Sequence, residues 1–573
     1  MFLVPVALLL ATLFYGRLAG PPDLTIQVTD RYSAAPLAGA EITSGETTLH
    51  TDEQGLATLP VTRDSFQVSV RAPHYEPLLA EVDPAGAERW PVALRPNVVS
   101  GRLHDVESGA PIAGARISVV GPDGATLDGV SGQDGAFAFE GVPANAKLVV
   151  DAGDYGVQEQ EIGQATAFDL SLKSTVVYGM VRDDLGAPLA GVRVATADGS
   201  AATATGADGA FRLAGGSGVG ELLVADSGFA EQRLQIPANR QVDATLQREQ
   251  IKSLYANANI VAEPGRLNEL IRIANETEIN AIVIDVKQDQ IFYDTQVQFF
   301  RDVPNMVNPL YDVHEILDQL HQNNIYAIAR MVVFKDPLVA EAYPNLAVKD
   351  EVTGGLWRDM NDAAWVNAFN EELWTANADL AAELAGLGFD EVQYDYIRFP
   401  SDGDLRTAEF GNDYTEDLRR AAITGAVALG SQETRANGAA FAIDLFPIIA
   451  IYGNDQGIGQ TLQDLTPLAD YVNLMIYPSH YERGNIPVDG HPNDFPAETV
   501  TYTLQRAEEL VPGTMAKMRP WLQDFTYPAE GYSAYGPKEV RAQIDAAEAM
   551  GVSGWILWDA AGDFTEDALR PAG

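Results

Sequence analysis

The alternation of hydrophobic and polar residues changes character once along the chain, near Gln250. Before this point, short stretches alternate between apolar and polar residues and are separated by turns rich in glycine, proline and aspartate. This period of two is typical of strands with one buried face. After Gln250, β-rich apolar runs alternate with amphipathic stretches of helical period. The pattern therefore predicts an all-β part followed by an α/β part.

The all-β part contains three copies of one pattern. The copies open with PLAGAEI at Pro36, PIAGARI at Pro111 and PLAGVRV at Pro188. A second signal follows in each copy: TDEQGLATL at 51–59, SGQDGAFAF at 131–139 and TGADGAFRL at 205–213. The first copy departs from the others, with Glu53 and Gln54 before its glycine instead of an aspartate. Copies of about 75 residues with short strands are typical of small β-sandwiches. We expect three such modules, over residues 22–97, 98–173 and 174–248.

The α/β part holds eight β-rich runs separated by helical stretches. The runs cover residues 253–260, 280–287, 325–334, 390–399, 441–447, 471–479, 515–525 and 552–560. Three of the intervening stretches place apolar residues on one helical face: Leu267, Leu270, Ile271 and Ala274; Leu373, Leu380, Leu384 and Leu387; Val540, Ile544 and Ala547. Eight strands alternating with helices predict a (β/α)8 barrel of the TIM type over residues 252–573. A doubly wound open sheet is the alternative architecture.

Charged and aromatic residues gather at the ends of the predicted strands. In a barrel of this kind the carboxyl ends of the strands build the active site. The residues at these positions are Asp285, Lys287, Arg330, Lys335, Asp336, Asp395, Arg398, Asp444, Tyr477, Ser479, His480, Arg519, Trp521, Asp524, Trp558 and Asp559. Carboxylates accept hydrogen bonds from hydroxyl groups, and aromatic rings present large apolar faces for the CH groups of a sugar. The mixture predicts a sugar-binding cleft.

Both parts of the chain resemble known families. The recurring landmarks of the all-β part resemble carboxypeptidase regulatory-like (transthyretin-like) domains, which implies spacer or adhesion modules attached to a secreted enzyme. NAIVIDVK, ARMVVFKD, GFDEVQYDYIRFPSDG, YVNLMIYPSHY, RPWLQDF and GWILWDA resemble a bacterial family of barrel proteins assigned as glycoside hydrolases. That family is similar in layout to the α-amylase-like enzymes. The resemblance, over about residues 252–565, implies a barrel that hydrolyses glycosidic bonds and leaves the sugar open.

Glycoside hydrolysis generally needs two carboxyl groups, one that donates a proton and one that attacks the sugar or activates water. Asp395 is the first candidate because it lies at the end of the fourth predicted strand, where barrel glycosidases keep a catalytic carboxylate. We expect Arg398 either to keep Asp395 ionised or to form with it a buried ion pair that closes the barrel mouth. The partner is Asp444 if the layout follows the amylase-like enzymes, and Asp524 if it follows the commoner barrel pattern. We favour Asp444.

The other strand-end residues are expected to bind the substrate. Asp285 is either a third carboxylate of the site or the structural partner of Lys287. Trp521 and Trp558 are either stacking platforms or core residues. The remaining predicted contacts are Arg330, Asp336, Arg398, Tyr477, His480 and Asp559.

Composition narrows the classes of partner. The formal net charge of −44 argues against binding to nucleic acid, which needs basic patches. The absence of cysteine excludes disulfides, thiol nucleophiles and zinc–thiolate sites. We expect no metal and no other cofactor. The sequence specifies no oligomeric state.

The N-terminal segment, residues 1–20, is almost continuously apolar from Phe2 to Tyr15. This length suits a signal peptide or a short N-terminal membrane anchor. The sequence therefore predicts a periplasmic, cell-surface or secreted glycoside hydrolase that acts on an extracellular or cell-envelope polysaccharide. The alternative is a non-catalytic barrel that binds carbohydrate or peptidoglycan, preceded by adhesion-type β modules.

Overall fold

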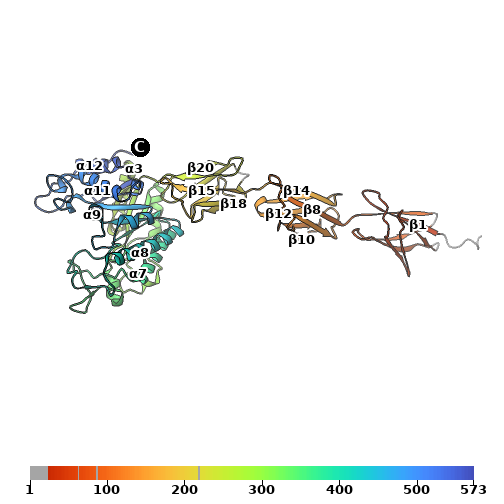
Figure 1. The fold of residues 1–573 in the computed structure, drawn as a ribbon, viewed down its shortest axis with the longest axis horizontal. Coiled ribbons are helices and arrows are strands. Elements are labelled where there is room, and N and C mark those ends of the chain that lie inside the picture. Colours follow the sequence, from red (N-terminus) through yellow and green to blue (C-terminus); the bar gives the residue numbers. More distant parts are fainter. Residues whose placement is uncertain (1–22, 62–63, 85–87, 217–219, 573) are drawn as a thin grey trace, which may run out of the picture. The chain divides into compact units, whose positions relative to one another are not determined.

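The computed structural model describes residues 23–61, 64–84, 88–216 and 220–572 (Figure 1). The predicted signal peptide or anchor at residues 1–20 lies outside the described residues. Among the residues that are described, no helix is both long enough and apolar enough to cross a membrane.

The N-terminal part folds into three β-sandwich modules with one topology, coloured red to yellow in Figure 1. Each module has a three-stranded sheet and a four-stranded sheet, in the orders β4-β1-β7 and β3-β2-β5-β6 in the first module. Its strands are β1 Asp23–Asp30, β2 Glu41–Ser44, β3 Thr47–His50, β4 Leu56–Pro60, β5 Phe66–Arg71, β6 Leu78–Val82 and β7 Arg89–Leu94. The predicted sandwich class is confirmed.

The second and third modules repeat this order strand by strand. The second has β8 Val98–Asp105, β9 Arg116–Val120, β10 Thr126–Val130, β11 Ala136–Glu140, β12 Lys147–Asp151, β13 Val157–Glu161 and β14 Ala167–Leu172. The third has β15 Val177–Asp183, β16 Arg193–Thr196, β17 Ala202–Ala204, β18 Ala210–Leu213, β19 Glu221–Ala225, β20 Gln232–Gln235 and β21 Ala244–Leu246.

A glycine at the same place in each module explains why the second sequence signal recurs. Gly55, Gly135 and Gly209 have φ angles of 72°, 76° and 74°. A Cβ at these glycines would lie 2.4, 2.2 and 2.5 Å from a backbone carbonyl oxygen of the neighbouring strand. Only glycine satisfies both constraints. The irregular first copy keeps its glycine, and Asp52 there accepts the hydrogen bond from the Leu56 amide (2.8 Å).

The C-terminal part is a closed barrel of eight parallel strands in chain order. The strands are β22 Ile251–Ala256, β23 Ala281–Lys287, β24 Tyr326–Val332, β26 Glu391–Asp395, β28 Ala440–Leu445, β29 Tyr471–Ile476, β30 Trp521–Gln523 and β31 Gly554–Trp558. β22 pairs with both β23 and β31, so the predicted barrel is confirmed and the open sheet is excluded. The first predicted run extended too far, because Asn257 caps a short helix, α2 Ala258–Ala262.

Helices cover the outside of the barrel. The helices that follow α2 are α3 Pro264–Glu276, α4 Gln298–Arg301, α5 Val313–Gln322, α6 Pro337–Ala342, α7 Glu371–Leu387, α8 Glu416–Ala436, α9 Ile448–Tyr452, α10 Leu462–Leu465, α11 Pro496–Leu510 and α12 Pro537–Ala549. The three predicted helical faces lie on α3, α7 and α12, and all their members are buried except the partly buried Leu387. A two-stranded ribbon, β25 Lys349–Asp350 and β27 Ala408–Glu409, joins two of the long loops.

The barrel interior is layered. Near the amino ends of the strands, Glu391 and Arg519 form an ion pair in which both side chains are fully buried. Arg519 was expected at the carboxyl end of the seventh strand, but it precedes that strand. Above it lies an apolar layer that includes Val283, Ile328 and Ile556. The other predicted strand-end charges begin above this layer. The barrel interior therefore contains charged residues both near the amino ends and near the carboxyl ends of the strands. Only those near the carboxyl ends belong to the barrel mouth.

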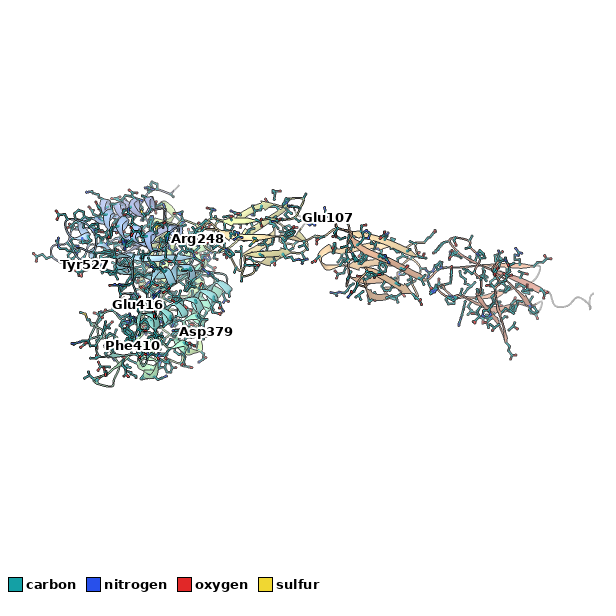
Figure 2. The ribbon with its side chains drawn as sticks, in the orientation of Figure 1. Glu107, Arg248, Asp379, Phe410, Glu416 and Tyr527 are labelled. Carbon is teal, nitrogen blue, oxygen red and sulfur yellow. The ribbon has the colours of Figure 1, made fainter. Side chains whose placement is uncertain are left out.

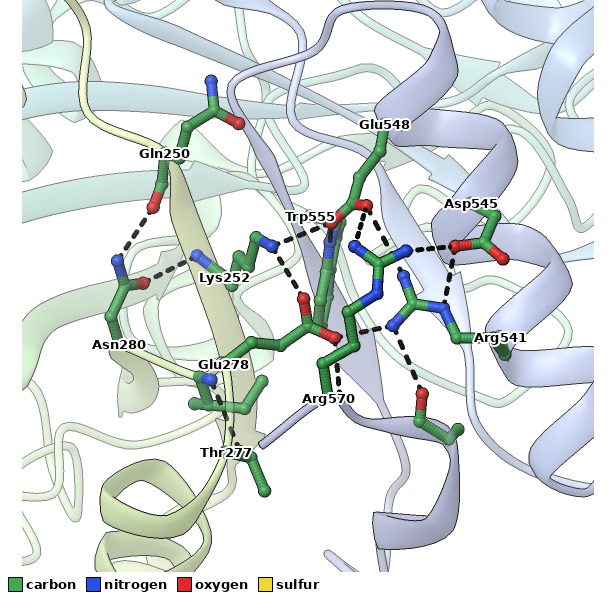
Figure 3. A network of polar contacts seen from close by, with 12 residues as sticks. Gln250, Lys252, Thr277, Glu278, Asn280, Arg541, Asp545, Glu548, Trp555 and Arg570 are labelled. Atoms are coloured by element: carbon green, nitrogen blue, oxygen red, sulfur yellow. Dashed lines mark hydrogen bonds and ion pairs between the residues drawn. The ribbon is translucent and has the colours of Figure 1, made fainter. Parts of the chain in front are cut away.

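A polar network joins the first strand to the last helix and the C-terminal segment (Figure 3). Lys252 on β22 lies 2.7 Å from Glu278 and 2.8 Å from Glu548 on α12. Arg541 lies 2.6 Å from Glu278, and Arg570 lies 3.0 Å from Glu548. Because β22 has to pair with β31 to close the barrel, this network stabilises the point of closure.

The described chain divides into two compact units, and most of the third module belongs to the same unit as the barrel. Arg248, labelled in Figure 2, pairs with Asp183 of the module (2.6 Å) and donates to the Asp470 carbonyl of the barrel (3.3 Å). The Tyr471 hydroxyl donates to the Gly228 carbonyl at 2.7 Å. These buried contacts indicate that the third module is docked on the barrel and is not a free spacer.

Candidate active site

A cavity of about 650 Å³ opens at the carboxyl ends of the barrel strands. Its lining residues are Arg330, Asp395, Tyr396, Phe446, Pro447, Ile448, Tyr452, Met475, Tyr477, His480, Tyr481, Glu482, Asn485, Trp521 and Trp558. A concave, largely aromatic surface with a few polar groups is the usual form of a small-molecule or sugar site. The structure brings six of the predicted site residues together here: Arg330, Asp395, Tyr477, His480, Trp521 and Trp558.

Arg330 organises the floor of this cavity. It lies on β24 and forms ion pairs with Asp285 on one side and with Asp395 on the other. Its Nε atom lies 3.1 Å from Asp395 Oδ2 and 3.8 Å from Asp444 Oδ2. Three carboxyl groups from three strands therefore surround one guanidinium group. Arg330 was predicted as a substrate contact, and its closest contacts are these carboxylates.

Asp395 is held at a sharp change of backbone direction. It is the last residue of β26, and the amide of Tyr396 donates a hydrogen bond to its Oδ1. Tyr396 has a φ of 50°, a left-handed conformation that costs a non-glycine residue about 1–3 kcal/mol. The turn ends the strand and brings the Tyr396 ring to the cavity wall beside Asp395. Strain of this kind is concentrated at functional sites.

The predicted ion pair between Asp395 and Arg398 does not form, although the two charges still interact. The Arg398 guanidinium lies over the rings of Trp365, Tyr396 and Phe446, with its Cζ 4.9, 5.0 and 4.3 Å from their centroids. It donates to the Phe399 carbonyl at 3.0 Å. The left-handed turn at Tyr396 lies between Asp395 and Arg398 in the chain. Asp395 pairs instead with Arg330 on β24. Arg398 supports the Tyr396 ring from behind and does not line the cavity.

Asp444 lies beneath the cavity wall and not in it. Its side chain is fully buried, and its Oδ1 accepts hydrogen bonds from Trp521 (2.8 Å), Asn473 (3.0 Å) and Gln393. Its Oδ2 has no hydrogen-bond partner among the described residues. Burial, with the charge of Asp395 as the next cause, raises the pKa of Asp444 to about 8. Asp444 therefore keeps its proton to a higher pH than an ordinary aspartate does.

Asp285 does not pair with Lys287, although only Val286 lies between them in the sequence. Arg330 and the Tyr255 hydroxyl bind Asp285. Lys287 instead pairs with Asp336 at 2.8 Å, and both side chains are buried. The ladder between β23 and β24 shifts register between residues 285 and 287, so the two side chains do not share a face. Lys287 and Asp336 were expected to bind substrate, and the structure places neither at the cavity.

Asp524 and Asp559 stabilise the loop that follows the last strand. Asp524 accepts hydrogen bonds from the Thr565 amide (2.9 Å) and hydroxyl (2.6 Å), and burial raises its pKa. Asp559 accepts from the Ala561 amide at 2.8 Å. Neither residue lines the cavity. Their predicted roles, as second catalytic carboxylate and as substrate contact, do not fit these positions.

Sequence reasoning missed the second carboxylate of the cavity, Glu482. It follows β29 in the segment Ser479–Asn485, is exposed, and has an amide that donates to Asn485 Oδ1 at 2.6 Å. The predicted strand run stopped at residue 479, and His480 was the last residue after it that was considered. The only available signal was a charged residue three positions after that run.

The two predicted stacking platforms differ. Trp521 is 2% exposed, and its indole nitrogen is bonded to Asp444. Trp558 is partly exposed and packs against the Tyr255 and Tyr477 rings, with centroid distances of 6.2 and 5.6 Å. Trp558 therefore presents ring surface to the cavity, whereas Trp521 fills the wall.

A closed parallel barrel with carboxylates and aromatic rings around a cavity at its strand ends is the architecture of barrel glycoside hydrolases. Residues 253–564 match the family model described as "Putative glycosyl hydrolase domain", and the chain belongs to this family. Residues 98–173 match the carboxypeptidase regulatory-like domain. Both resemblances seen in the sequence are thereby confirmed, and the barrel is a glycoside hydrolase barrel.

Solved structures similar to this chain include a hypothetical protein from Ruminiclostridium thermocellum, with 33% identity over 33% of this chain and 96% of that one, at a TM-score of 0.30. The glycoside hydrolase domain of PgaB (BpsB) from Bordetella bronchiseptica is 12% identical over 57% of this chain and 99% of that one, at 0.42. The spore cortex-lytic enzyme SleL from Bacillus megaterium is 10% identical over 59% and 75%, at 0.36. No curated protein matches the chain.

Proposed function

We propose that this protein is an exported glycoside hydrolase that cleaves an extracellular or cell-envelope polysaccharide, with Asp395 as the carboxylate that acts on the sugar. One observation carries the proposal. Asp395 lines an aromatic cavity in a glycoside hydrolase barrel, and Arg330 and the turn at Tyr396 hold its carboxyl group in place. A fixed carboxylate beside ring surfaces for the sugar is what the reaction requires.

Glu482 supplies the second carboxyl group in this proposal. It lines the same cavity as Asp395 and is exposed, so it can reach the oxygen of a bound glycosidic linkage. A proton passes from Glu482 to that oxygen as the bond to the anomeric carbon breaks. Asp395 either attacks the anomeric carbon to form a glycosyl ester that a water molecule then hydrolyses, or takes a proton from the water that attacks that carbon.

Asp444, the partner that the sequence favoured, has a supporting role here. Its carboxyl group is sealed beneath Trp521 and cannot reach a substrate in the cavity. Burial favours the neutral form of Asp444, so Arg330 pairs with the other two carboxylates, Asp285 and Asp395. The hydrogen bond from Trp521 to Asp444 fixes that ring in the cavity wall.

Export is supported by the apolar run from Phe2 to Tyr15 and by the regulatory-like modules. A polymeric substrate is supported by the openness of a cleft with exposed rings at its edge, Tyr452 and His480 among them. The alternative, a barrel that binds carbohydrate without cleaving it, is favoured by the ion pair between Asp395 and Arg330, which is also a stable resting arrangement.

The test is an assay of the full chain against a polysaccharide panel that includes peptidoglycan, with reducing ends and binding measured in parallel. We expect Asp395→Asn and Glu482→Gln each to lower the release of reducing ends at least about 100-fold while binding is retained. Asp559→Asn is the control, because that carboxylate caps a loop outside the cavity. Binding without release by the wild-type protein would establish the binding barrel instead.

A further inference from the structure

A continuous series of aromatic rings leads out of the cavity. Trp558 and His480 line the cavity, and the Phe525 ring lies 5.1 Å from Trp558 and 6.1 Å from His480. His480 lies 5.6 Å from Tyr527, and Tyr527 lies 4.8 Å from Tyr532. The last ring, His491, lies 4.7 Å from Tyr532. These are centroid separations within the range of direct ring contact.

The outer three rings, Tyr527, Tyr532 and His491, do not line the cavity and have no role in the chemistry proposed for it. All three are partly exposed. Aromatic rings that only fill a core are covered by other side chains. Here, each ring is supported by the next and still has part of its surface in contact with solvent. Figure 2 labels Tyr527 on the barrel.

The two loops that carry these rings are bonded to each other. The side-chain nitrogen of Asn493, Nδ2, donates to the Ser533 carbonyl at 3.0 Å, and the Tyr535 hydroxyl donates to the backbone carbonyl of Asn493 at 3.2 Å. Within one loop, the Tyr535 amide donates to Thr526 Oγ1 at 3.0 Å. The rings are therefore held in place before any ligand arrives, which lowers the entropy lost on binding.

The charge of these loops restricts what can bind. Residues 484–495 and 525–536 contain Asp489, Asp494 and Glu530 and no lysine or arginine, and the exposed Arg483 and Lys538 flank them. The whole chain is also strongly acidic. An anionic polysaccharide would therefore meet more negative than positive groups along these loops. The surface suits uncharged sugar units whose CH faces stack on the rings.

We propose that Tyr527, Tyr532 and His491 form an outer subsite of the cleft, which holds uncharged sugar units of a polysaccharide several units away from the cavity. The substrate is accordingly a neutral polymer and not a disaccharide. The inference rests on the proposed function in placing the bound chain across the same cavity, but binding at the outer rings needs no cleavage.

The test is affinity electrophoresis in native gels that contain hydroxyethyl cellulose, glucomannan, glycol chitin or, as the anionic polymer, polygalacturonate. The full chain carries Asp395→Asn, so that no polymer is degraded. We expect retardation by at least one of the three neutral polymers and none by polygalacturonate. Tyr532→Ala should weaken that retardation about tenfold, and Tyr532→Phe, which keeps the ring, should restore it.

Tyr178→Ala is the matched control, because it removes a tyrosine ring that is 47% exposed and belongs to the third module. It should leave retardation unchanged. Equal retardation of Tyr532→Ala and its parent would overturn the proposal, as would retardation by no neutral polymer or by polygalacturonate alone. Circular dichroism melting of Tyr532→Ala and Tyr532→Phe separates loss of the ring from loss of the fold.

The outcomes also separate this inference from the proposed hydrolase. If Tyr532→Ala loses binding but the wild-type protein releases no reducing ends, the subsite stands and the hydrolase fails. If the wild-type protein cleaves a polymer at a rate that Tyr532→Ala does not change, the hydrolase stands and the subsite fails.

Discussion

The indole nitrogen of Trp521 donates a 2.8 Å hydrogen bond to Oδ1 of Asp444, and this bond couples the wall of the cavity to a buried carboxyl group beneath it. Trp521 can stay in one orientation within the wall only while its N–H has a buried acceptor. Asp444 supplies that acceptor, and burial favours the neutral form of Asp444 by raising its pKa. The wall of the site therefore depends on a group that the substrate does not touch.

The first prediction concerns stability against pH. The raised pKa of Asp444 means that the folded state binds one more proton than the unfolded state between about pH 4 and pH 8. Its contribution is fully present below the ordinary pKa of an aspartate and is lost as the pH rises through about 8. Asp444→Asn keeps the Oδ1 acceptor and cannot ionise. We expect this variant to lose less stability than wild type from pH 6 to pH 9, as measured by urea unfolding.

Asp559→Asn serves as the comparison, because it removes a carboxylate at the same end of the barrel that accepts only backbone amides. Its unfolding curves should keep the wild-type dependence on pH. Parallel pH profiles for wild type and Asp444→Asn would show that Asp444 is already ionised in the folded protein.

The second prediction concerns Arg330. Its removal would leave Asp285 and Asp395 buried without their common partner. Breaking a buried ion pair from one side typically costs about 3–5 kcal/mol, so we expect Arg330→Met to lower the free energy of unfolding by about that amount. Chemical denaturation measures the loss. Arg406→Met, which breaks an exposed pair with Asp404, should cause no measurable change.

The third prediction concerns acid stability at the point of barrel closure. Burial acts to raise the pKa of Glu278, and the hydrogen bonds from Lys252, the Arg570 amide and Arg541 outweigh it, so the pKa is lowered. A lowered pKa contributes stability above the ordinary pKa of a glutamate, about 4.3, and this contribution is lost as the pH falls further. The free energy of unfolding of Glu278→Gln should therefore lie below that of wild type at pH 7, and the two values should converge near pH 3. A constant difference across that range would argue against the network.

The fourth prediction concerns the docking of the third module. Burial and the charge of Asp470 raise the pKa of Asp226 to about 7, against the opposing effect of Arg435. A raised pKa contributes stability that is lost as the pH rises through about 7. Hydrogen exchange of residues 226–229 should accordingly be faster at pH 8.5 than at pH 6, after correction for the intrinsic rate. Asp226→Asn should remove this acceleration, whereas Asp198→Asn, an exposed aspartate of the same module, should not.

Much of the site could be located from the sequence, but its internal pairing could not. The eight strand ends were identified from local periodicity, so Asp395, Arg330, Tyr477 and Trp558 were correctly expected at the barrel mouth. The partner of Asp395 was sought three residues away, at Arg398, whereas it lies 65 residues away on the adjacent strand. Glu482 was missed because it lies in a loop, where no regular alternation of apolar and polar residues indicates the direction of the side chains.

The modules, the order of the barrel strands and the apolar faces of the helices could be predicted from the chain alone, because each is encoded in residues that are close in sequence. The recurring glycines and the alternation of apolar residues are such local signals. Which carboxylates are buried and which face the cavity became clear only from the folded molecule. Those properties depend on neighbours from other strands, on the register shift near Lys287 and on the turn at Tyr396. Electrostatic energies change steeply when the distance between two charged groups changes, so these local features decide the environment of each carboxylate.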